Sequence, residues 1–207
     1  MKDTYRTISG KAEGIFKDKG SKFLSFAFPV SSVEEIKEII SNLKKQYHDA
    51  RHHCYAYKLG TKNELYRMND DGEPSGTAGK PIYGQILSND LTNVLILVIR
   101  YFGGTLLGTS GLINAYRSAA TDAIVNSVIT VRIIEDLYIV DFDYADMSKV
   151  MRIIREENLE QLQPVFDQKC ELNLKIRQRD ASRITSRLKS IPSLTIVKKE
   201  VDNNFMN

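Results

Sequence analysis

The sequence predicts an α+β protein built from two domains. Helical and strand-like hydrophobic patterns follow one another along all 207 residues, so neither kind of element dominates. The order of elements changes after about residue 131, where a β-α-β-β-α-β succession begins, which is typical of a ferredoxin-like domain. We therefore expect a first domain at residues 1–132 and a ferredoxin-like domain at residues 133–207, with the boundary inside residues 130–136.

The composition indicates an ordinary globular protein with a mildly basic first domain. Hydrophobic residues make up 42% of the chain and charged residues 27%, and the formal net charge is +3. Lys and Arg outnumber Asp and Glu by 16 to 13 up to Thr130, whereas each group counts 13 from Val131 onward. A basic surface, which favours a polyanionic partner, is therefore expected on the first domain.

Two further observations favour a cytoplasmic protein. Cys54 and Cys170 lie far apart and lack the CxxC spacing of zinc ribbons and redox motifs. The N-terminus has no apolar signal core, and the apolar run at residues 94–99 is too short to span a bilayer. We expect reduced thiols and no membrane contact.

In the first domain the patterns predict strands and three helices. Strands are expected at residues 12–19, 22–30, 51–59, 64–68 and 93–102, and helices at residues 33–47, 80–87 and 110–127. Ser31 and Ser32 are candidate caps of the first helix, and Pro81 suits the first position of the second. Thr109 and Ser110 are candidate caps of the third helix.

In the second domain the same reasoning predicts four strands and two helices. Strands are expected at residues 137–143, 162–168, 170–178 and 193–201, and helices at residues 146–158 and 180–190. Asp180 is a candidate cap of the last helix. Arg179, Arg183 and Arg187 share one face of that helix, a spacing that suits either a solvated surface or a stripe that contacts phosphates.

Two glycine-rich loops hold most of the chain's glycines. Eight of the twelve fall between Gly72 and Gly111, and seven of these lie in a loop at residues 69–81 or in a loop that follows the apolar run at residues 94–99. Because a glycine loop that leads into a helix exposes backbone N–H groups, these loops favour anionic ligands. The first loop is not a P-loop, since Pro74 stands where that motif needs glycine and Pro81 where it needs Ser or Thr.

The first glycine loop also carries an acidic triplet, Asp70, Asp71 and Glu73. Neighbouring loop carboxylates more often serve turns and helix caps than hold Mg²⁺, so we expect no metal. Arg100 ends the buried strand, where an unpaired charge is costly, so we expect it to pair with Asp71 or Glu73 and join the two loops. The residues expected to form this structural clamp are Asp71, Glu73, Gly76, Gly79 and Gly108.

The strand at residues 51–59 offers a candidate RNA-binding face. Alternation places Arg51, His53, Tyr55 and Tyr57 on one side of the strand. If exposed, this basic and aromatic side would suit the stacking of RNA bases. His52 and Cys54 fall on the other side, so alternation disfavours both a metal shared by the two histidines and a nucleophile pair of Cys54 with His53.

Three segments of the chain resemble the IMPACT family in its bacterial, YigZ-like form. They are RHHCYAY at residues 51–57, NDDGEPSGTAGKPI at residues 69–82 and VIRYFGGTLLGTSGLINAYRSA at residues 98–119. The resemblance covers residues 1–130 and implies a ribosomal-protein-S5-domain-2-like α/β fold for the first domain. The second domain looks like that of the bacterial members, which resembles a ferredoxin-like domain of elongation factor G.

The resemblance also implies a connection with translation. The eukaryotic members of the family modulate translation by competing for the activator of the general-control kinase, which phosphorylates an initiation factor. Their accessory domains differ, so this implication concerns the first domain. Both domain types recur in translation factors and RNA-binding proteins, which is an analogy at the level of the fold.

Together these observations favour a non-catalytic regulator that acts in translation. It is expected to bind RNA, the ribosome or a translation-linked protein through the glycine-loop face of the first domain, with no catalytic residue, cofactor, metal or sequence-specific DNA contact. The expected binding residues are Arg51, His53, Tyr55, Tyr57, Thr77, Lys80, Arg100, Gly103, Gly104, Thr109 and Ser110.

Two alternatives stay open at this point. One is an enzyme or binder that acts on a phosphorylated small molecule or nucleotide and is related by fold to small-molecule kinases. GTLLGTSGLINA at residues 104–115 has a faint likeness to the glycine–serine loop of those kinases but lacks their run of adjacent small residues. The other is a protein-interaction adaptor that docks a partner on its acidic glycine loop.

Overall fold

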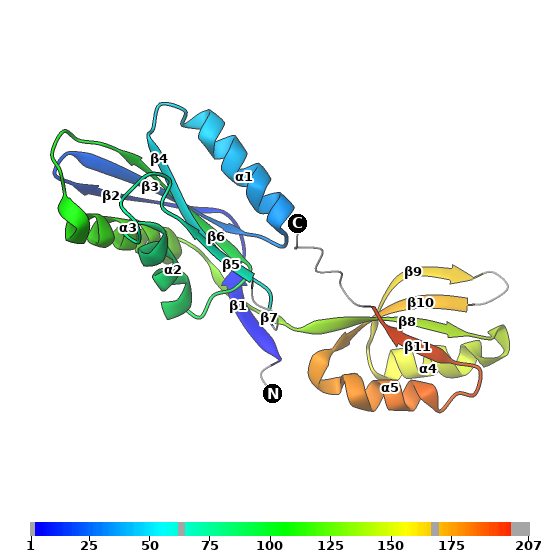
Figure 1. Ribbon diagram of the computed structural model, residues 1–207. Coiled ribbons are helices and arrows are strands. Elements are labelled where there is room, and N and C mark those ends of the chain that lie inside the picture. The colour runs from blue at the N-terminus through cyan, green and yellow to red at the C-terminus, as the bar shows by residue number, and fades with distance from the viewer. Residues whose placement is uncertain (1–2, 62–64, 167–169, 200–207) are drawn as a thin grey trace. The chain divides into compact units, whose positions relative to one another are not determined.

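The computed structural model describes residues 3–61, 65–166 and 170–199 (Figure 1). The described residues form two compact units, one of residues 5–132 and one of residues 3–4 together with residues 133–199. Each unit combines helices with a β-sheet, so the predicted α+β class and the presence of two domains are confirmed. Within the described residues, no helix is long and apolar enough to cross a membrane.

The first unit is organised around a five-stranded antiparallel sheet with the order β2-β3-β6-β4-β5. Its strands are β2 (Ala12–Asp18), β3 (Ser21–Pro29), β4 (His52–Leu59), β5 (Leu65–Asn69) and β6 (Val94–Tyr101). Helix α1 (Val33–Gln46) covers one face, and helices α2 (Gly79–Ser88) and α3 (Gly108–Val125) cover the other (Figure 1). The central strand β6 is therefore buried on both sides, which explains its unbroken apolar run.

The side chains of β6 divide alternately between the two faces of the sheet. Val94, Ile96 and Val98 pack with the buried alanines of α3, whose small side chains let the helix lie close to the sheet. Leu95 belongs to the cluster under α1, and Leu97 and Ile99 extend that cluster toward the helix's C-terminal end.

A two-stranded sheet of β1 (Thr4–Ile8) and β7 (Ile129–Ile133) was not expected from the sequence. The Ser9 N–H donates to the Val128 carbonyl at 2.9 Å, and the Ile134 N–H donates to the Asp3 carbonyl at 2.8 Å. Both strands have only five residues and are mostly half-buried or exposed, so their hydrophobic pattern is weak.

The second unit has the element order β-α-β-β-α-β. Its elements are β8 (Glu135–Phe142), α4 (Met147–Glu156), β9 (Glu160–Phe166), β10 (Cys170–Arg177), α5 (Ala181–Lys189) and β11 (Thr195–Lys198). The strands form an antiparallel sheet in the order β11-β8-β10-β9. Both helices pack on one face of it, over a core that includes Val140, Leu172 and Leu188 (Figure 1).

The helix starts differ from the expectations in three places. Helix α2 begins at Gly79, so Pro81 is its third residue rather than its first. Helix α3 begins at Gly108, directly after Leu107, so Thr109 and Ser110 lie inside its first turn and do not cap it. Asp180 precedes α5, but its side chain makes no capping hydrogen bond.

The start of α1 agrees with the sequence. The Ser32 hydroxyl accepts a hydrogen bond from the Glu35 N–H at 3.1 Å. The Glu35 carboxylate in turn accepts from the Ser31 N–H at 2.7 Å, so both ends of this reciprocal cap are present.

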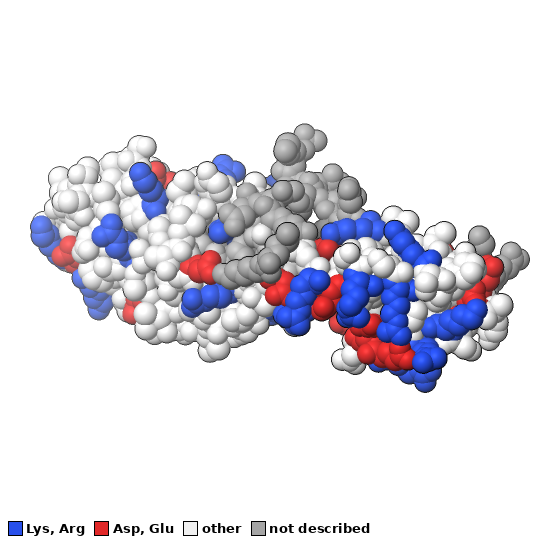
Figure 2. All heavy atoms as spheres, turned by 90° about the horizontal axis from the view of Figure 1, so that it is seen from below, with Lys and Arg blue, Asp and Glu red and all other residues white. Residues whose placement is uncertain are grey.

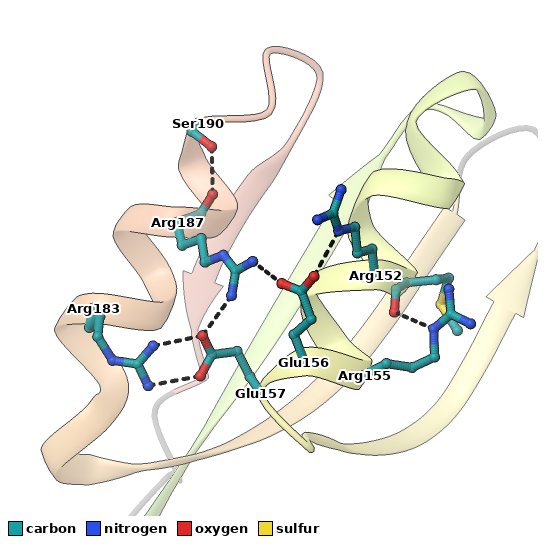
Figure 3. A network of polar contacts seen from close by, with 8 residues as sticks. Arg152, Arg155, Glu156, Glu157, Arg183, Arg187 and Ser190 are labelled. Carbon is teal, nitrogen blue, oxygen red and sulfur yellow. Dashed lines mark hydrogen bonds and ion pairs between the residues drawn. The ribbon is translucent and has the colours of Figure 1, made fainter.

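The arginines at residues 179, 183 and 187, whose spacing suits either a solvated surface or a phosphate-contacting stripe, are paired within the second unit. Arg183 binds the Glu157 carboxylate through two hydrogen bonds, at 2.6 and 2.8 Å, and Arg187 binds the same carboxylate at 2.8 Å (Figure 3). Arg187 also contacts Glu156 (Figure 3). Arg179, just before α5, lies 3.4 Å from Asp180. The ion pairs of Arg183 and Arg187 join α4 to α5. Figure 2 shows Lys and Arg mixed with Asp and Glu on this face.

Candidate functional site

The two glycine loops meet at the end of β6, where Arg100 lies on the face of the sheet that α2 and α3 cover. Arg100 is 6% exposed. Its Nη1 donates to Glu73 Oε1 at 2.7 Å, and the Tyr116 hydroxyl donates to the same oxygen at 2.8 Å. Glu73 comes from the first loop, Arg100 from β6 and Tyr116 from α3, so one carboxylate oxygen joins the first loop to a strand and a helix. Of the two acids expected to pair with Arg100, the structure thus selects Glu73.

Aromatic rings surround the Arg100 guanidinium. Its central carbon lies 5.6 Å from the ring centroid of Phe23 and 5.6 Å from that of Phe102. Rings at this distance attract a cation through their negative faces. The Arg100 Nε is buried without a hydrogen-bond partner in the described residues, so Glu73 and these rings are the main compensation for the buried charge.

Cys54 extends this network on its other side. The Cys54 sulfur lies 3.3 Å from the Tyr116 hydroxyl and 3.0 Å from the Asp70 carbonyl oxygen. Burial raises the pKa of the Cys54 thiol far above its usual value, so the side chain stays a neutral thiol at physiological pH. Burial likewise raises the pKa of Tyr116, which keeps its hydroxyl a donor toward Glu73.

Asp70 and Asp71 stabilise the first glycine loop. Asp70 accepts from the N–H groups of Ala78 and Gly79 at 3.0 and 2.8 Å, and from that of Gly76 at 2.9 Å. No side chain caps α2 from the adjacent position. Asp70 caps this helix instead, from eight residues upstream of Ala78. The described residues contain no group of three His, Cys, Asp or Glu side chains that could hold a metal ion.

Asp71 fastens the same loop to β4 and α1. Its carboxylate accepts from the His53 N–H at 2.7 Å and from the Lys44 ammonium at 3.0 Å. Burial opposes ionisation of Asp71, but the hydrogen bonds from His53 and Lys44 outweigh it and lower the pKa of this carboxyl. Asp71 is thus a charged structural anchor rather than a proton donor.

The prediction that one side of the strand at residues 51–59 is exposed is wrong for two of its residues. His53 and Tyr57 are each 5% exposed, because α1 covers this face of the sheet. Tyr55 is half-buried and its ring is stacked on that of Tyr57, with centroids 6.4 Å apart. His53 Nε2 lies 3.1 Å from the Tyr47 carbonyl, and burial lowers the pKa of this imidazole. Arg51, just before β4, remains exposed.

The second glycine loop presents an exposed surface. Residues 102–106 are all exposed, with Phe102 at 50% and Leu106 at 82%. Gly103 lies against the turn between β2 and β3: a Cβ there would come within 1.9 Å of the Gly20 carbonyl carbon. Only glycine fits this close approach, and the positive φ of Gly104 (85°) gives a second reason for glycine in this loop.

The remaining predicted binding residues divide between exposed and buried positions. Thr109 and Ser110 are exposed in the first turn of α3, and Lys80 is exposed in the first turn of α2. Thr77 is buried, and its hydroxyl donates to the Pro74 carbonyl at 2.6 Å. It therefore shapes the loop from inside. Among the expected clamp glycines, Gly76 and Gly108 adopt positive φ, and a Cβ on Gly79 would lie 2.7 Å from the Asn69 nitrogen.

Sequence reasoning missed the role of Tyr116 and the exposure of Phe102 and Leu106. Tyr116 is the one aromatic residue on the alanine-rich buried face of α3. A buried tyrosine hydroxyl usually finds a polar partner, and this was the signal that could have placed it beside the acidic loop.

Comparisons with known proteins agree with the family resemblance. Residues 19–124 match the family model described as the Impact N-terminal domain. An IMPACT family member from Haemophilus influenzae is 29% identical over 182 residues, which cover 86% of this chain and 88% of that protein. IMPACT family member YvyE from Bacillus subtilis is 33% identical over 156 residues, which cover 75% of this chain and 72% of YvyE. The crystal structure of a hypothetical protein has the same fold, with a TM-score of 0.72 and 22% identity over 98% of this chain and 100% of the other.

Proposed function

The chain belongs to the IMPACT family, and from this premise we propose that it is a non-catalytic regulator of translation that binds RNA, the ribosome or a translation-linked protein. Its docking surface is the glycine-loop face of residues 5–132. This face comprises the exposed loop at residues 102–106, the exposed first turn of α3, and the exposed cations Arg51 and Lys80.

One observation carries the proposal: the charged groups beneath this face are bound to partners inside the first unit. Glu73 accepts from Arg100 and Tyr116, and Asp70 and Asp71 accept from backbone N–H groups of the loop and of β4. These polar groups therefore hold the loops in shape. What they support is a surface of backbone, hydroxyl, aromatic and cationic groups, which suits docking on a large polyanionic or mixed partner.

The folds of both units support a partner in translation by analogy. The β-α-β-β-α-β order and the antiparallel sheet of residues 133–199 agree with the expected ferredoxin-like domain. For residues 5–132, the family resemblance implies the ribosomal-protein-S5-domain-2-like fold. Both folds recur in translation factors, which gives weight to a translation-linked partner without identifying it.

Co-sedimentation in a sucrose gradient tests the proposal. The tagged full chain is run in lysate at low and high salt, with and without ribonuclease. We expect sedimentation with ribosomal or other RNA-containing particles at low salt and its loss at high salt, because phosphate contacts weaken as salt rises. Arg51→Ala and Lys80→Ala should each reduce this sedimentation, whereas Lys189→Ala, at an exposed lysine of the second unit, should not.

Two results would count against this surface. If both Arg51→Ala and Lys80→Ala sediment like the unaltered chain, the glycine-loop face is not the docking surface. If the unaltered chain stays at the top of the gradient in every condition, its partner is not an RNA-containing particle.

The start of α3 favours one alternative, an enzyme or binder that acts on a phosphorylated small molecule or nucleotide. This 18-residue helix has no side-chain cap hydrogen bond, and its first turn is exposed, so its backbone N–H groups face solvent. Titration calorimetry with ATP and GTP, each with and without Mg²⁺, separates the two functions. Heat of binding would favour the alternative, and its absence would remove it.

A further inference from the structure

Helix α1 covers the face of the first unit's sheet opposite α2 and α3 (Figure 1). A basic groove lies along this helix. It has a volume of about 610 Å³ and is lined mainly by Lys37, Ile40, Lys44, Lys45, His48 and Tyr55. Because α1 covers the other face of the sheet, the groove is distinct from the glycine-loop face.

Two of the groove's three lysines, Lys37 and Lys45, lack internal partners among the described residues. Lys37, Lys45 and His48 make no hydrogen bond or ion pair with another described residue, and no described acidic residue lines the groove. Asp71 accepts from the third lysine, Lys44, and Asp49 accepts from the Tyr101 hydroxyl at 2.8 Å. The groove therefore presents positive charge that the first unit itself does not neutralise.

The groove also has an apolar component. Ile40 and Tyr55 are both half-buried, and Tyr55 is fixed by its parallel stacking on Tyr57. The groove thus combines an apolar floor with cations along the helix. An inorganic anion would satisfy the cations but leave this floor without contacts.

We propose that this groove binds an acidic, extended peptide segment of a partner protein. From Lys37 to Lys45 the helix rises about 12 Å, at 1.5 Å per residue, which an extended peptide covers with about four residues. Side chains of such a peptide alternate between two sides. Carboxylates on one side reach Lys37 and Lys45, and apolar side chains on the other pack on Ile40 and Tyr55.

The same features favour a peptide over a single strand of RNA. Bases of single-stranded nucleic acids bind on open aromatic rings. The groove offers few such rings, because Tyr55 is half-buried and already stacked on Tyr57. The inference does not depend on the function proposed for the glycine-loop face.

The test uses the full chain and a fluorescent eight-residue peptide of alternating Glu and Leu, followed by fluorescence anisotropy. We expect saturable binding, weakened about tenfold or more by Lys37→Glu with Lys45→Glu. The control, Lys17→Glu with Lys22→Glu, makes the same charge change at exposed lysines of β2 and β3 and should leave affinity within about twofold of the original. A peptide with Ser in place of Leu should bind more weakly, because it cannot use the apolar floor.

Three outcomes would overturn the proposal. The first is that the unaltered chain does not bind the peptide although its circular dichroism and thermal unfolding are normal. The second is an equal loss of affinity in the groove variant and the control, which would indicate unspecific attraction. In the third, the chain binds an oligouridylate but not the peptide, and the groove variant abolishes this binding. The groove would then be a nucleic-acid site. Because the co-sedimentation experiment tests Arg51 and Lys80 instead of the groove, failure of the peptide test would leave the proposed function standing.

Discussion

At the scale of single residues, Glu73 binds more side chains beneath the glycine-loop face than the sequence indicates. Its side chain is 3% exposed, and one of its oxygens accepts from both Arg100 and Tyr116. A buried ion pair is a weak source of net stability, but removing one partner leaves a buried charge without compensation. The pair should therefore respond very differently to single and double substitution.

We predict that Arg100→Met lowers the free energy of unfolding by about 3–5 kcal/mol, because it leaves the Glu73 carboxylate buried and unpaired. The double variant Glu73→Leu with Arg100→Met should lose less than Arg100→Met alone, since it removes both charges. Urea denaturation followed by circular dichroism measures both values. A loss of less than about 1 kcal/mol in the single variant would mean that the pair does not hold the loops together.

Residue-level reasoning from the sequence succeeded where a local rule applied. The cost of an unpaired charge at the end of a buried strand pointed to an acidic partner for Arg100, and the structure supplies Glu73. The same reasoning failed for His53 and Tyr57, because alternation assigns residues to two faces without saying which face a helix covers. That choice is made by the packing of α1, which the alternation of residues within β4 does not specify.

At the scale of elements, α4 and α5 are joined by charges rather than left as separate solvated surfaces. Arg183 and Arg187 both bind Glu157, whose side chain is 10% exposed, while that of Arg183 is 60% exposed (Figure 3). The hydrogen bonds from Arg183 and then Arg187 lower the pKa of Glu157 to about 2. The carboxylate is thus ionised in the folded chain at pH values where it is protonated in the unfolded chain.

This difference predicts a pH-dependent contribution to stability. Because the folded-state pKa lies below the ordinary value of 4.5, the contribution is full above pH 4.5 and is lost as pH falls toward 2. Glu157→Gln should therefore lower the free energy of unfolding at pH 7, and the difference from the unaltered chain should shrink between pH 4.5 and pH 2.5. Urea denaturation at these three pH values measures it.

The matched control is Glu171→Gln, at an exposed glutamate of β10 in the same unit. Its effect on stability should be small at every pH, because most exposed surface charges contribute little. If Glu157→Gln and Glu171→Gln behave alike, the contacts of Glu157 with α5 do not stabilise the second unit.

Elements with a strong hydrophobic period were predictable from the sequence, and those without one were not. Helix α1 and strand β6 each carry an unbroken pattern, and both were expected within about two residues of their bounds. β1 and β7 were missed, because they are held mainly by their pairing with each other. The cap of α2 was missed for a related reason: Asp70 reaches its N–H groups through the fold of the loop.

At the scale of the whole molecule, each unit has its own hydrophobic core, and each core contains one cysteine. Cys54 belongs to the core of residues 5–132, and Cys170 to that of the second unit. Both are 0% exposed and neither forms a disulfide. The two thiols therefore report separately on the opening of the two cores.

We predict that neither thiol of the native chain reacts readily with Ellman's reagent, since a buried thiol is both inaccessible and protonated. As urea rises, each should react when its own unit unfolds. Cys170→Ala leaves Cys54 as the probe of the first unit, and Cys54→Ala leaves Cys170 as the probe of the second. Because the units bury separate cores, we expect two different midpoints, with far-ultraviolet circular dichroism changing at both. A single midpoint shared by both thiols would mean that the two cores unfold as one cooperative structure, and the stability of each unit would then depend on the other.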